Sequence, residues 1–208
     1  MPKSKRLKAI LFLGISGFLL VFVFLPILGH TWRKRHEIWH PPVVAASGWK
    51  RFNSNEGKFS VRFPGTPETT NIMSTFSQSE NELPIEVRTP IFYVNPNIQN
   101  AFVVGYSDNP VFSQMAKLPD PQEFLKKCEF LAVSKAEGKV VFEQGSKFQN
   151  FPSREFEYVA GGKANYSARV KYILVGERVY SMYVVFLTTN PYPDERKIFF
   201  GSFKIQSD

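Results

Sequence analysis

The sequence has few of the side chains that carry most enzyme and metal chemistry. It contains one cysteine, Cys128, and its three histidines all lie before residue 41. One cysteine cannot form an intrachain disulfide, and a zinc site needs several cysteine or histidine ligands. Serine and cysteine nucleophiles commonly need an imidazole base, which residues 41–208 lack. We therefore expect no catalytic residues, no metal site and no cofactor, and we expect that the protein is not an enzyme.

The part of the chain after residue 36 also lacks the excess of positive charge that nucleic-acid binding needs. The formal net charge is +8, but seven of the 26 lysines and arginines precede residue 37, and all 18 acidic residues lie at or after Glu37. The other 19 basic residues nearly balance the acidic ones. A domain without a net positive field does not attract a polyanion. We therefore expect no nucleic-acid partner.

Charged residues are absent from Ile10 to Leu28, a segment that reads ILFLGISGFLLVFVFLPIL. As a helix it would be about 28 Å long, close to the roughly 30 Å hydrocarbon thickness of a bilayer. We predict a transmembrane anchor at residues 10–28, in contact with membrane lipid, after a short basic N-terminus at residues 1–9. A tether follows at residues 29–48, and residues 49–208 form one folded domain.

The fate and orientation of this segment leave alternatives. Residues 29–33 read GHTWR and make a poor cleavage site, so a retained anchor is preferred and a cleaved signal peptide is the alternative. Basic residues flank both ends of the segment, so the positive-inside bias nearly cancels. We expect a single-pass membrane protein whose C-terminal domain lies outside the cytoplasm, although Arg33, Lys34 and Arg35 favour the opposite orientation.

The pattern after residue 49 is rich in predicted strands. Residues 59–63 alternate between apolar and polar side chains, which is typical of a half-buried strand. Pro84 and Pro90 indicate an edge or irregular strand at residues 85–94, and Gly176 with Glu177 predicts a two-residue hairpin turn. The remaining strands are predicted at residues 68–77, 101–106, 139–142, 154–159, 166–175 and 179–188.

Two helices complete the predicted fold. Asp120 is a candidate N-cap and Pro121 suits the first helical position, which predicts a helix to residue 135 with Cys128 on its buried side. A second helix is predicted at residues 193–203. Because residues 179–187 are apolar on both faces, they belong at the centre of a covered sheet. The predicted fold class is therefore α+β, an antiparallel β-sheet covered by helices on both faces (an α/β/α sandwich), preceded by one transmembrane helix.

One charged cluster resembles a catalytic centre at first sight. Alternation along two neighbouring strands places Glu155, Glu157, Arg169 and Lys171 on one face. A turn centred on Gly162 sets Glu155 opposite Arg169, whereas a slip of two residues sets Glu157 opposite Arg169 and Glu155 opposite Lys171. In either register we interpret the cluster as cross-strand ion pairs on a solvated face, and not as an active site.

Four stretches of the chain suggest a known family. They are residues 57–67 (GKFSVRFPGTP), 152–156 (PSREF), 174–180 (LVGERVY) and 199–204 (FFGSFK). In this order and spacing, the chain from residue 49 to 205 resembles the PsbP-like, Mog1-type α/β/α sandwich family, which includes bacterial relatives of unknown function. The resemblance implies that architecture. It also implies a binding or assembly factor, because members of the family mostly have such roles, and it carries over no site residue.

These observations predict a membrane-anchored, non-catalytic interaction or assembly module with a protein partner. The sequence pattern names no ligand-binding residue. Phenylalanine is abundant, with 21 residues, which keeps open an alternative function as a carrier or sensor of a small apolar ligand. A deep apolar cavity would favour the carrier, whereas a filled core with an exposed apolar patch would favour the module.

Overall fold

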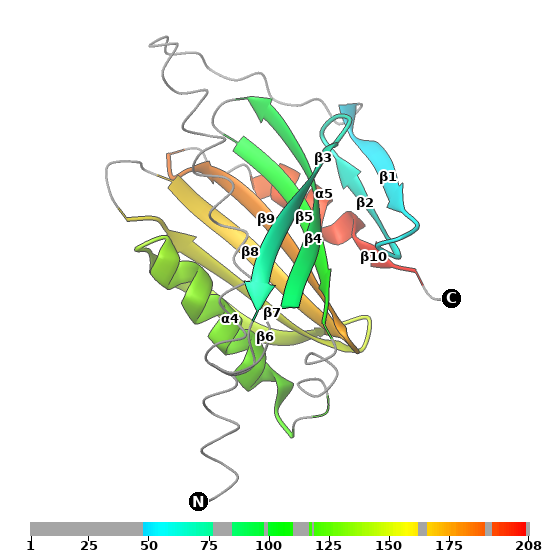
Figure 1. Cartoon of the computed structure of the whole chain (residues 1–208). Helices are drawn as coiled ribbons and strands as arrows, with labels where there is room; N and C mark the ends of the chain where they lie inside the picture. Colours follow the sequence, from blue (N-terminus) through cyan, green and yellow to red (C-terminus); the bar gives the residue numbers. More distant parts are fainter. Residues whose placement is uncertain are drawn as a thin grey trace, which may run out of the picture.

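The computed structural model describes residues 48–76, 85–97, 100–109, 117, 119–161, 166–189 and 193–206. Within them it contains ten strands and two helices (Figure 1). The strands are β1 (Lys50–Ser54), β2 (Phe59–Phe63), β3 (Glu68–Phe76), β4 (Ile85–Asn97), β5 (Asn100–Asp108), β6 (Lys139–Phe148), β7 (Phe151–Val159), β8 (Tyr166–Val175), β9 (Arg178–Leu187) and β10 (Lys204–Ile205). The helices are α4 (Pro121–Lys135) and α5 (Pro193–Ser202).

The strands form two antiparallel sheets. The larger sheet has seven strands in the order β3-β4-β5-β9-β8-β7-β6, and the smaller has three in the order β1-β2-β10. Strand β9 is the central strand of the seven, as its two apolar faces predict. Strands β6 to β9 lie side by side in chain order, and Gly176 with Glu177 joins β8 to β9, as the sequence predicts.

Helix α4 covers one face of the larger sheet (Figure 1). The Asp120 side chain accepts a hydrogen bond from the backbone N–H of Gln122 at 3.0 Å, so the predicted N-cap is confirmed. The buried side of the helix includes Leu125 and Cys128, which belong to the same core cluster as Phe156 of β7. Cys128 is therefore a core residue, as predicted, and burial raises the pKa of its thiol to about 12.

The other face of the larger sheet is covered by the smaller sheet together with α5. Aromatic rings fill the space between them. Phe59 of β2 stacks on Phe203 at a centroid distance of 5.5 Å, and Phe102 of β5 meets Phe199 of α5 edge-on at 5.4 Å. Trp49 meets Phe102 edge-on at 5.5 Å. Buried aromatic rings in such arrangements stabilise a core beyond the area that they bury.

The predicted α/β/α sandwich is wrong. Only the α4 face is covered by a helix alone, because the opposite face carries a second β-sheet beside α5. The sequence predicts β2 as a strand but does not predict which sheet contains it. In the structure β2 lies outside the larger sheet and pairs with β1 and β10. The predicted anchor at residues 10–28 lies outside the described residues. Among those that are described, no helix has the length and apolar character to cross a membrane.

Strand β4 shows how a sheet accommodates its prolines. Of the two predicted alternatives, an edge strand and an irregular strand, the first is wrong, because β4 lies between β3 and β5. It is irregular as predicted, with a register shift between Val94 and Asn97. Pro90 pairs with Asn71 of β3, but the ladder to β5 begins only at Ile91. The missing N–H of Pro90 therefore removes no bond from the ladder with β5.

Candidate functional site

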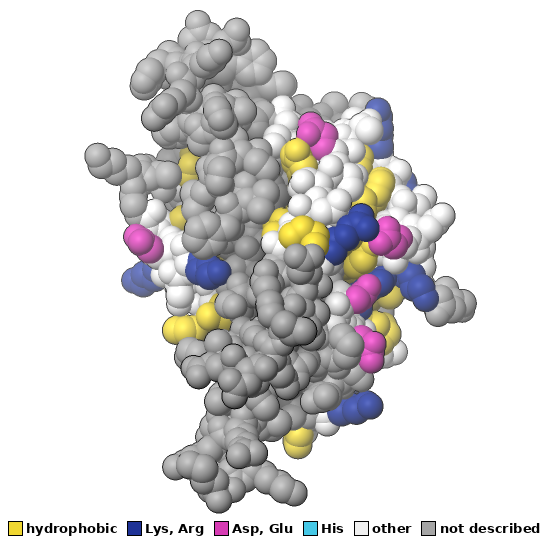
Figure 2. Space-filling view, in the orientation of Figure 1, with side chains coloured by type: hydrophobic (Ala, Val, Ile, Leu, Met, Phe, Trp, Pro, Cys, Tyr) yellow, Lys and Arg dark blue, Asp and Glu magenta, His cyan; other side chains and the backbone are white. Residues whose placement is uncertain are grey.

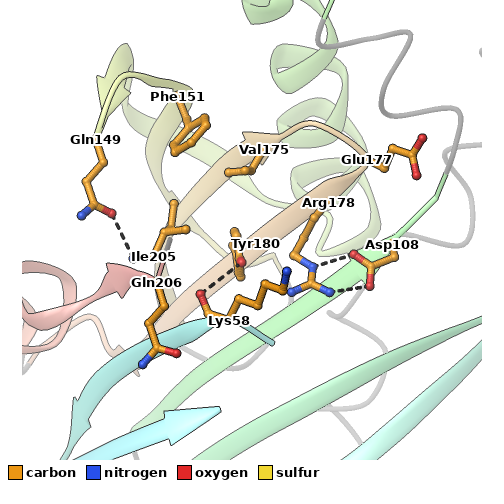
Figure 3. A pocket seen from close by; sticks show the side chains of 10 residues that line it. All are labelled: Lys58, Asp108, Gln149, Phe151, Val175, Glu177, Arg178, Tyr180, Ile205 and Gln206. Atoms are coloured by element: carbon orange, nitrogen blue, oxygen red, sulfur yellow. Dashed lines mark hydrogen bonds and ion pairs between the residues drawn. The ribbon is translucent and has the colours of Figure 1, made fainter. Parts of the chain in front are cut away.

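A pocket of about 550 Å³ opens at the end of the two packed sheets where several turns meet (Figure 3). The turn before β2, the β6–β7 turn, the β8–β9 turn, the end of β5 and the end of β10 all contribute to it. The floor is apolar and the rim is polar. The lining residues are Lys58, Asp108, Gln149, Phe151, Val175, Glu177, Arg178, Tyr180, Ile205 and Gln206.

Arg178 is the best-held side chain of the pocket. Its guanidinium donates to both carboxylate oxygens of Asp108, at 2.6 and 2.7 Å, and to the backbone carbonyl of Glu56 at 3.1 Å. The same guanidinium lies 4.5 Å from the ring centroid of Tyr106, in cation–π contact. Bidentate pairing with a carboxylate fixes an arginine in orientation as well as position. Hydrogen bonding to Asp108 raises the pKa of Arg178, so the group is cationic at every accessible pH.

Two side-chain to backbone hydrogen bonds and one backbone bond link the segments around the pocket. The Tyr180 hydroxyl donates to the carbonyl of Gly57 at 2.8 Å. The Gln149 side-chain oxygen accepts from the backbone N–H of Ile205 at 2.9 Å, and the N–H of Gln206 donates to the Lys58 carbonyl at 2.9 Å. These three bonds link β9, the β6–β7 turn, the turn before β2 and the end of β10. The rim is therefore preorganised.

The turns themselves hold unusual backbone conformations. Gln149 and Asn150 both have positive φ, 48° and 69°, which is the feature of a type I′ hairpin turn. Lys58 also has positive φ, 50°. Residues other than glycine in this region cost conformational energy and are retained where their surroundings determine the chain path. Gly57 precedes Lys58, and a Cβ there would approach a ring carbon of Phe59 to 2.6 Å.

Two tyrosines below the rim have shifted pKa values. Burial and the charge of Glu56 raise the pKa of Tyr106 to about 12. Burial also raises the pKa of Tyr180, although Arg178 acts in the opposite direction. Both hydroxyls are therefore protonated at neutral pH. The pocket thus offers hydrogen-bond donors, paired charges and apolar side chains.

The pocket was not predicted from the sequence. Its residues come from five places in the chain, and the Gly176-Glu177 hairpin is the one local signal that the sequence analysis identified. No group of three histidine, cysteine, aspartate or glutamate side chains that could hold a metal ion is found in the part of the chain that the structure describes. Among the described side chains visible in Figure 2, basic and acidic ones are interspersed, and neither sign gathers into a patch.

Comparisons with known proteins place this architecture. Cyanobacterial PsbP (CyanoP) from a Synechocystis species matches with a TM-score of 0.53 and 7% identity, over 81% of this chain and 98% of that chain. The fold is PsbP-like. A Pseudomonas aeruginosa protein of unknown function matches with a TM-score of 0.38 and 11% identity, over 60% of this chain and 90% of that chain. No protein-family model and no curated protein sequence matches the chain.

The predicted charged cluster lies elsewhere on this PsbP-like fold, on the larger sheet beside α5. The observed register sets Glu155 opposite Lys171 and Glu157 opposite Arg169, which is the slipped one of the two predicted registers. Lys171 lies 2.8 Å from Glu155, and Arg169 lies 2.7 Å from Glu155 and 3.3 Å from Glu157. Arg196 of α5 adds a contact of 2.9 Å to Glu157. The cluster is therefore a network of ion pairs.

The cluster is less exposed than predicted. The Glu155 and Glu157 side chains are 23% and 20% exposed, so the face is half-buried and not fully solvated. The reason is α5, which brings Arg196 over this face, and the edge strand β6, whose Phe142 ring lies 3.7 Å from the Arg169 guanidinium. Sequence alternation gives the shared face correctly, but it does not show what packs upon that face.

A second ionic group lies under α4. Arg154 of β7 pairs with Glu129 of the helix and with Glu143 of β6. Arg154 and Glu129 are buried. Burial raises the pKa of Glu129, and its hydrogen bond to Arg154 acts in the opposite direction. The Arg154–Glu129 pair holds α4 against the sheet, because both of these charges lie out of water and each needs the other.

Proposed function

We propose that the folded part of this chain is a non-catalytic interaction or assembly module, held at a membrane by the predicted anchor at residues 10–28. The observation that carries this proposal is the preorganised rim of the pocket. Two turns, β9 and the end of β10 are linked by two side-chain to backbone bonds and one backbone bond, and the Arg178 charge is already matched by Asp108. A rigid rim with an apolar floor suits recognition of a partner at low entropic cost.

The charges of the described residues support a binding role over catalysis. The carboxylates of both ionic groups have cationic partners within the fold. Acid–base catalysis needs a group whose pKa lies near the working pH. Glu155 is shifted the other way: burial raises its pKa, but Lys171 and Arg169 outweigh burial and lower it.

The alternative function is a carrier or sensor of a small apolar ligand. One observation favours it, because Phe151, Val175 and Ile205 give the pocket an apolar floor. The phenylalanine-rich core argues against it, since rings such as Phe59, Phe102 and Phe199 pack on one another. We therefore place the alternative second.

A photo-crosslinking residue at Glu177, on the rim of the pocket, tests the proposal in cells that make the full chain. The matched control is the same residue at Lys126, which is exposed on the outer side of α4. We expect one discrete protein adduct from position 177 and none from position 126. The adduct should disappear when Lys58→Glu is added. Capture of a lipid or metabolite in place of a protein would favour the carrier, and equal labelling at both positions would contradict a pocket-based module.

The anchor is tested separately. We expect that the mature protein needs detergent for extraction, and that added protease digests the chain from about residue 49 in cells with a permeable outer layer. A mature chain that begins near residue 47 would indicate a cleaved signal peptide. Protection of the domain from protease would place it on the cytoplasmic side.

A further inference from the structure

Strand β3 lies at an edge of the larger sheet and has few of the features that prevent an edge strand from pairing with another strand. It pairs with β4 on one side, and no strand of the described residues pairs with its other side. Residues 69–76 read TTNIMSTF, without a charged residue, a proline or a glycine. Met73 is 57% exposed. An edge of this kind is a template for pairing with a further strand.

The opposite edge of the same sheet is protected. Strand β6 has a register irregularity between Val140 and Phe142, and a bulge of this kind interrupts edge pairing. Lysines stand near both of its ends, Lys139 and Lys147, and Glu143 lies between them. Bulges and edge charges are the devices by which proteins prevent strand association. One edge of this sheet is therefore guarded and the other is not.

We propose that two copies of the chain associate through β3, each adding its β3 antiparallel to that of the other, so that the two seven-stranded sheets become continuous. A two-fold axis perpendicular to the sheet generates this arrangement and keeps the α4-covered faces on one side. Side chains alternate between faces, so only residues of like parity can be opposed. The axis therefore passes between the two strands, midway between the two copies of one residue. Ile72, the middle of the nine residues of β3, allows every residue of the strand to pair.

This register avoids repulsion between like charges. Glu68 is the one charged residue of β3. In this register it lies opposite position 76 of the other copy, so the two Glu68 residues of the dimer lie at opposite ends of the ladder. Glu68 also accepts a hydrogen bond from the Tyr93 hydroxyl at 2.7 Å. Arg88 of β4 donates to Asn71 at 2.8 Å. The charges at this edge thus have partners within their own chain.

A second copy is the favoured occupant because the strand is complementary to itself. Isologous pairing about a two-fold axis is the commonest arrangement of soluble oligomers, and it needs a strand that does not repel its own sequence. The pocket lies on other elements, so association through β3 neither requires the proposed function nor follows from it.

Two substitutions of matched exposure test the proposal. Met73→Lys places a lysine on β3, and Val141→Lys places one on β6, where Val141 is 55% exposed. Sedimentation velocity of the full chain in detergent measures the association. We expect the unaltered chain and V141K to form dimers, and we expect M73K to raise the dimer dissociation constant about tenfold or more. A monomeric unaltered chain, or equal dimerisation of M73K and V141K, would overturn the proposal.

An engineered disulfide between the two copies tests the register without relying on the monomer–dimer equilibrium. About Ile72, residue 71 of one copy faces residue 73 of the other, at a spacing that an engineered disulfide can bridge. The double variant Asn71→Cys, Met73→Cys is expected to form a covalent dimer under mild oxidation, because Cys128 is the one native cysteine and is buried. The matched variant with cysteines at Val141 and Glu143 of β6 should form no covalent dimer. Crosslinking of both pairs, or of neither, would overturn the proposed edge.

Discussion

The charged side chains of the cluster on β7 and β8 are half-buried, and each has a partner there. Glu155 illustrates the balance. Burial alone would favour its neutral form, and the cations Lys171 and Arg169 reverse that preference, so that the net pKa is lowered. A carboxyl group whose folded-state pKa is lowered stabilises the protein above its unfolded pKa, and the contribution is lost as the pH falls through the folded pKa.

Glu155→Gln should therefore show a pH-dependent loss of stability. We expect about 1–2 kcal/mol less unfolding free energy at pH 7, since the side chain is partly exposed and its pairs are partly screened. The difference from the unaltered protein should vanish once the pH is below the folded-state pKa of Glu155. Urea denaturation at a series of pH values measures it. A difference that persists in acid would mean that packing, and not charge, explains the effect.

Arg154 should tolerate substitution far less well than Glu155 does. Replacing it with Met leaves Glu129 buried without its cationic partner, and removal of one member of a buried pair costs about 3–5 kcal/mol. The double variant Arg154→Met, Glu129→Leu should recover most of that loss, because no charge remains buried. Chemical denaturation of the single and double variants gives the comparison. A double variant as unstable as the single one would contradict this account of how α4 is held.

At the scale of the element, α4 depends on its first turn. Asp120→Ala removes the side chain that accepts from the Gln122 N–H, and we expect a loss of about 1 kcal/mol. Asp120→Asn keeps an acceptor and should cost a few tenths of a kcal/mol. Thermal unfolding followed by circular dichroism distinguishes them. Equal losses for both variants would show that the capping bond does not stabilise the helix.

Local signals predict the elements well but not how they combine. Alternation over residues 59–63 locates β2 at its observed bounds, and the Asp120 cap with Pro121 locates the start of α4. The second sheet was missed because alternation states which residues share a face and not which sheet a strand joins. Strand β10 has two residues, too few for a period-two pattern, and without it and β1 the second layer cannot be recognised.

The same limit applies to the candidate site. The charged cluster is found by alternation, because it lies on two strands joined by one short connection. The pocket joins Lys58 to Arg178 and Gln206 through contacts between parts of the chain that are distant in sequence. Positive φ at Gln149 and Asn150 belongs to a Gln-Asn turn that lacks the usual glycine. Apart from the Gly176-Glu177 hairpin, no local pattern of residues therefore marks the pocket.

At the scale of the whole molecule, the two cores contain their own stabilising contacts. We expect residues 48–208 produced alone to fold without a metal or cofactor. A chelator should then leave the thermal unfolding midpoint unchanged, and added divalent metal ions should not raise it, because nothing that binds only the folded state is being removed or supplied. Unfolding upon chelation would contradict this prediction and would indicate a metal site.

Trp49 joins the beginning of the described chain to the aromatic core. Its side chain is 6% exposed, and its indole N–H finds no acceptor among the described residues. Trp49→Ala should cost about 3–5 kcal/mol through the cavity that it leaves. Trp49→Phe keeps most of the volume and removes the unsatisfied donor, so a loss under about 1.5 kcal/mol is expected. Urea denaturation followed by circular dichroism tests both, and equal losses would exclude the cavity as the cause.

The position of Trp49 also decides where a mechanical load enters the fold. A pull transmitted from residues before 48 reaches the indole before it reaches the first backbone pair of β1, Lys50 with Phe63. Because the indole packs edge-on against Phe102 of the larger sheet, we expect part of the force to pass through side-chain packing into the seven-stranded sheet. The three-stranded sheet would then share the load with the larger sheet and would not bear it alone.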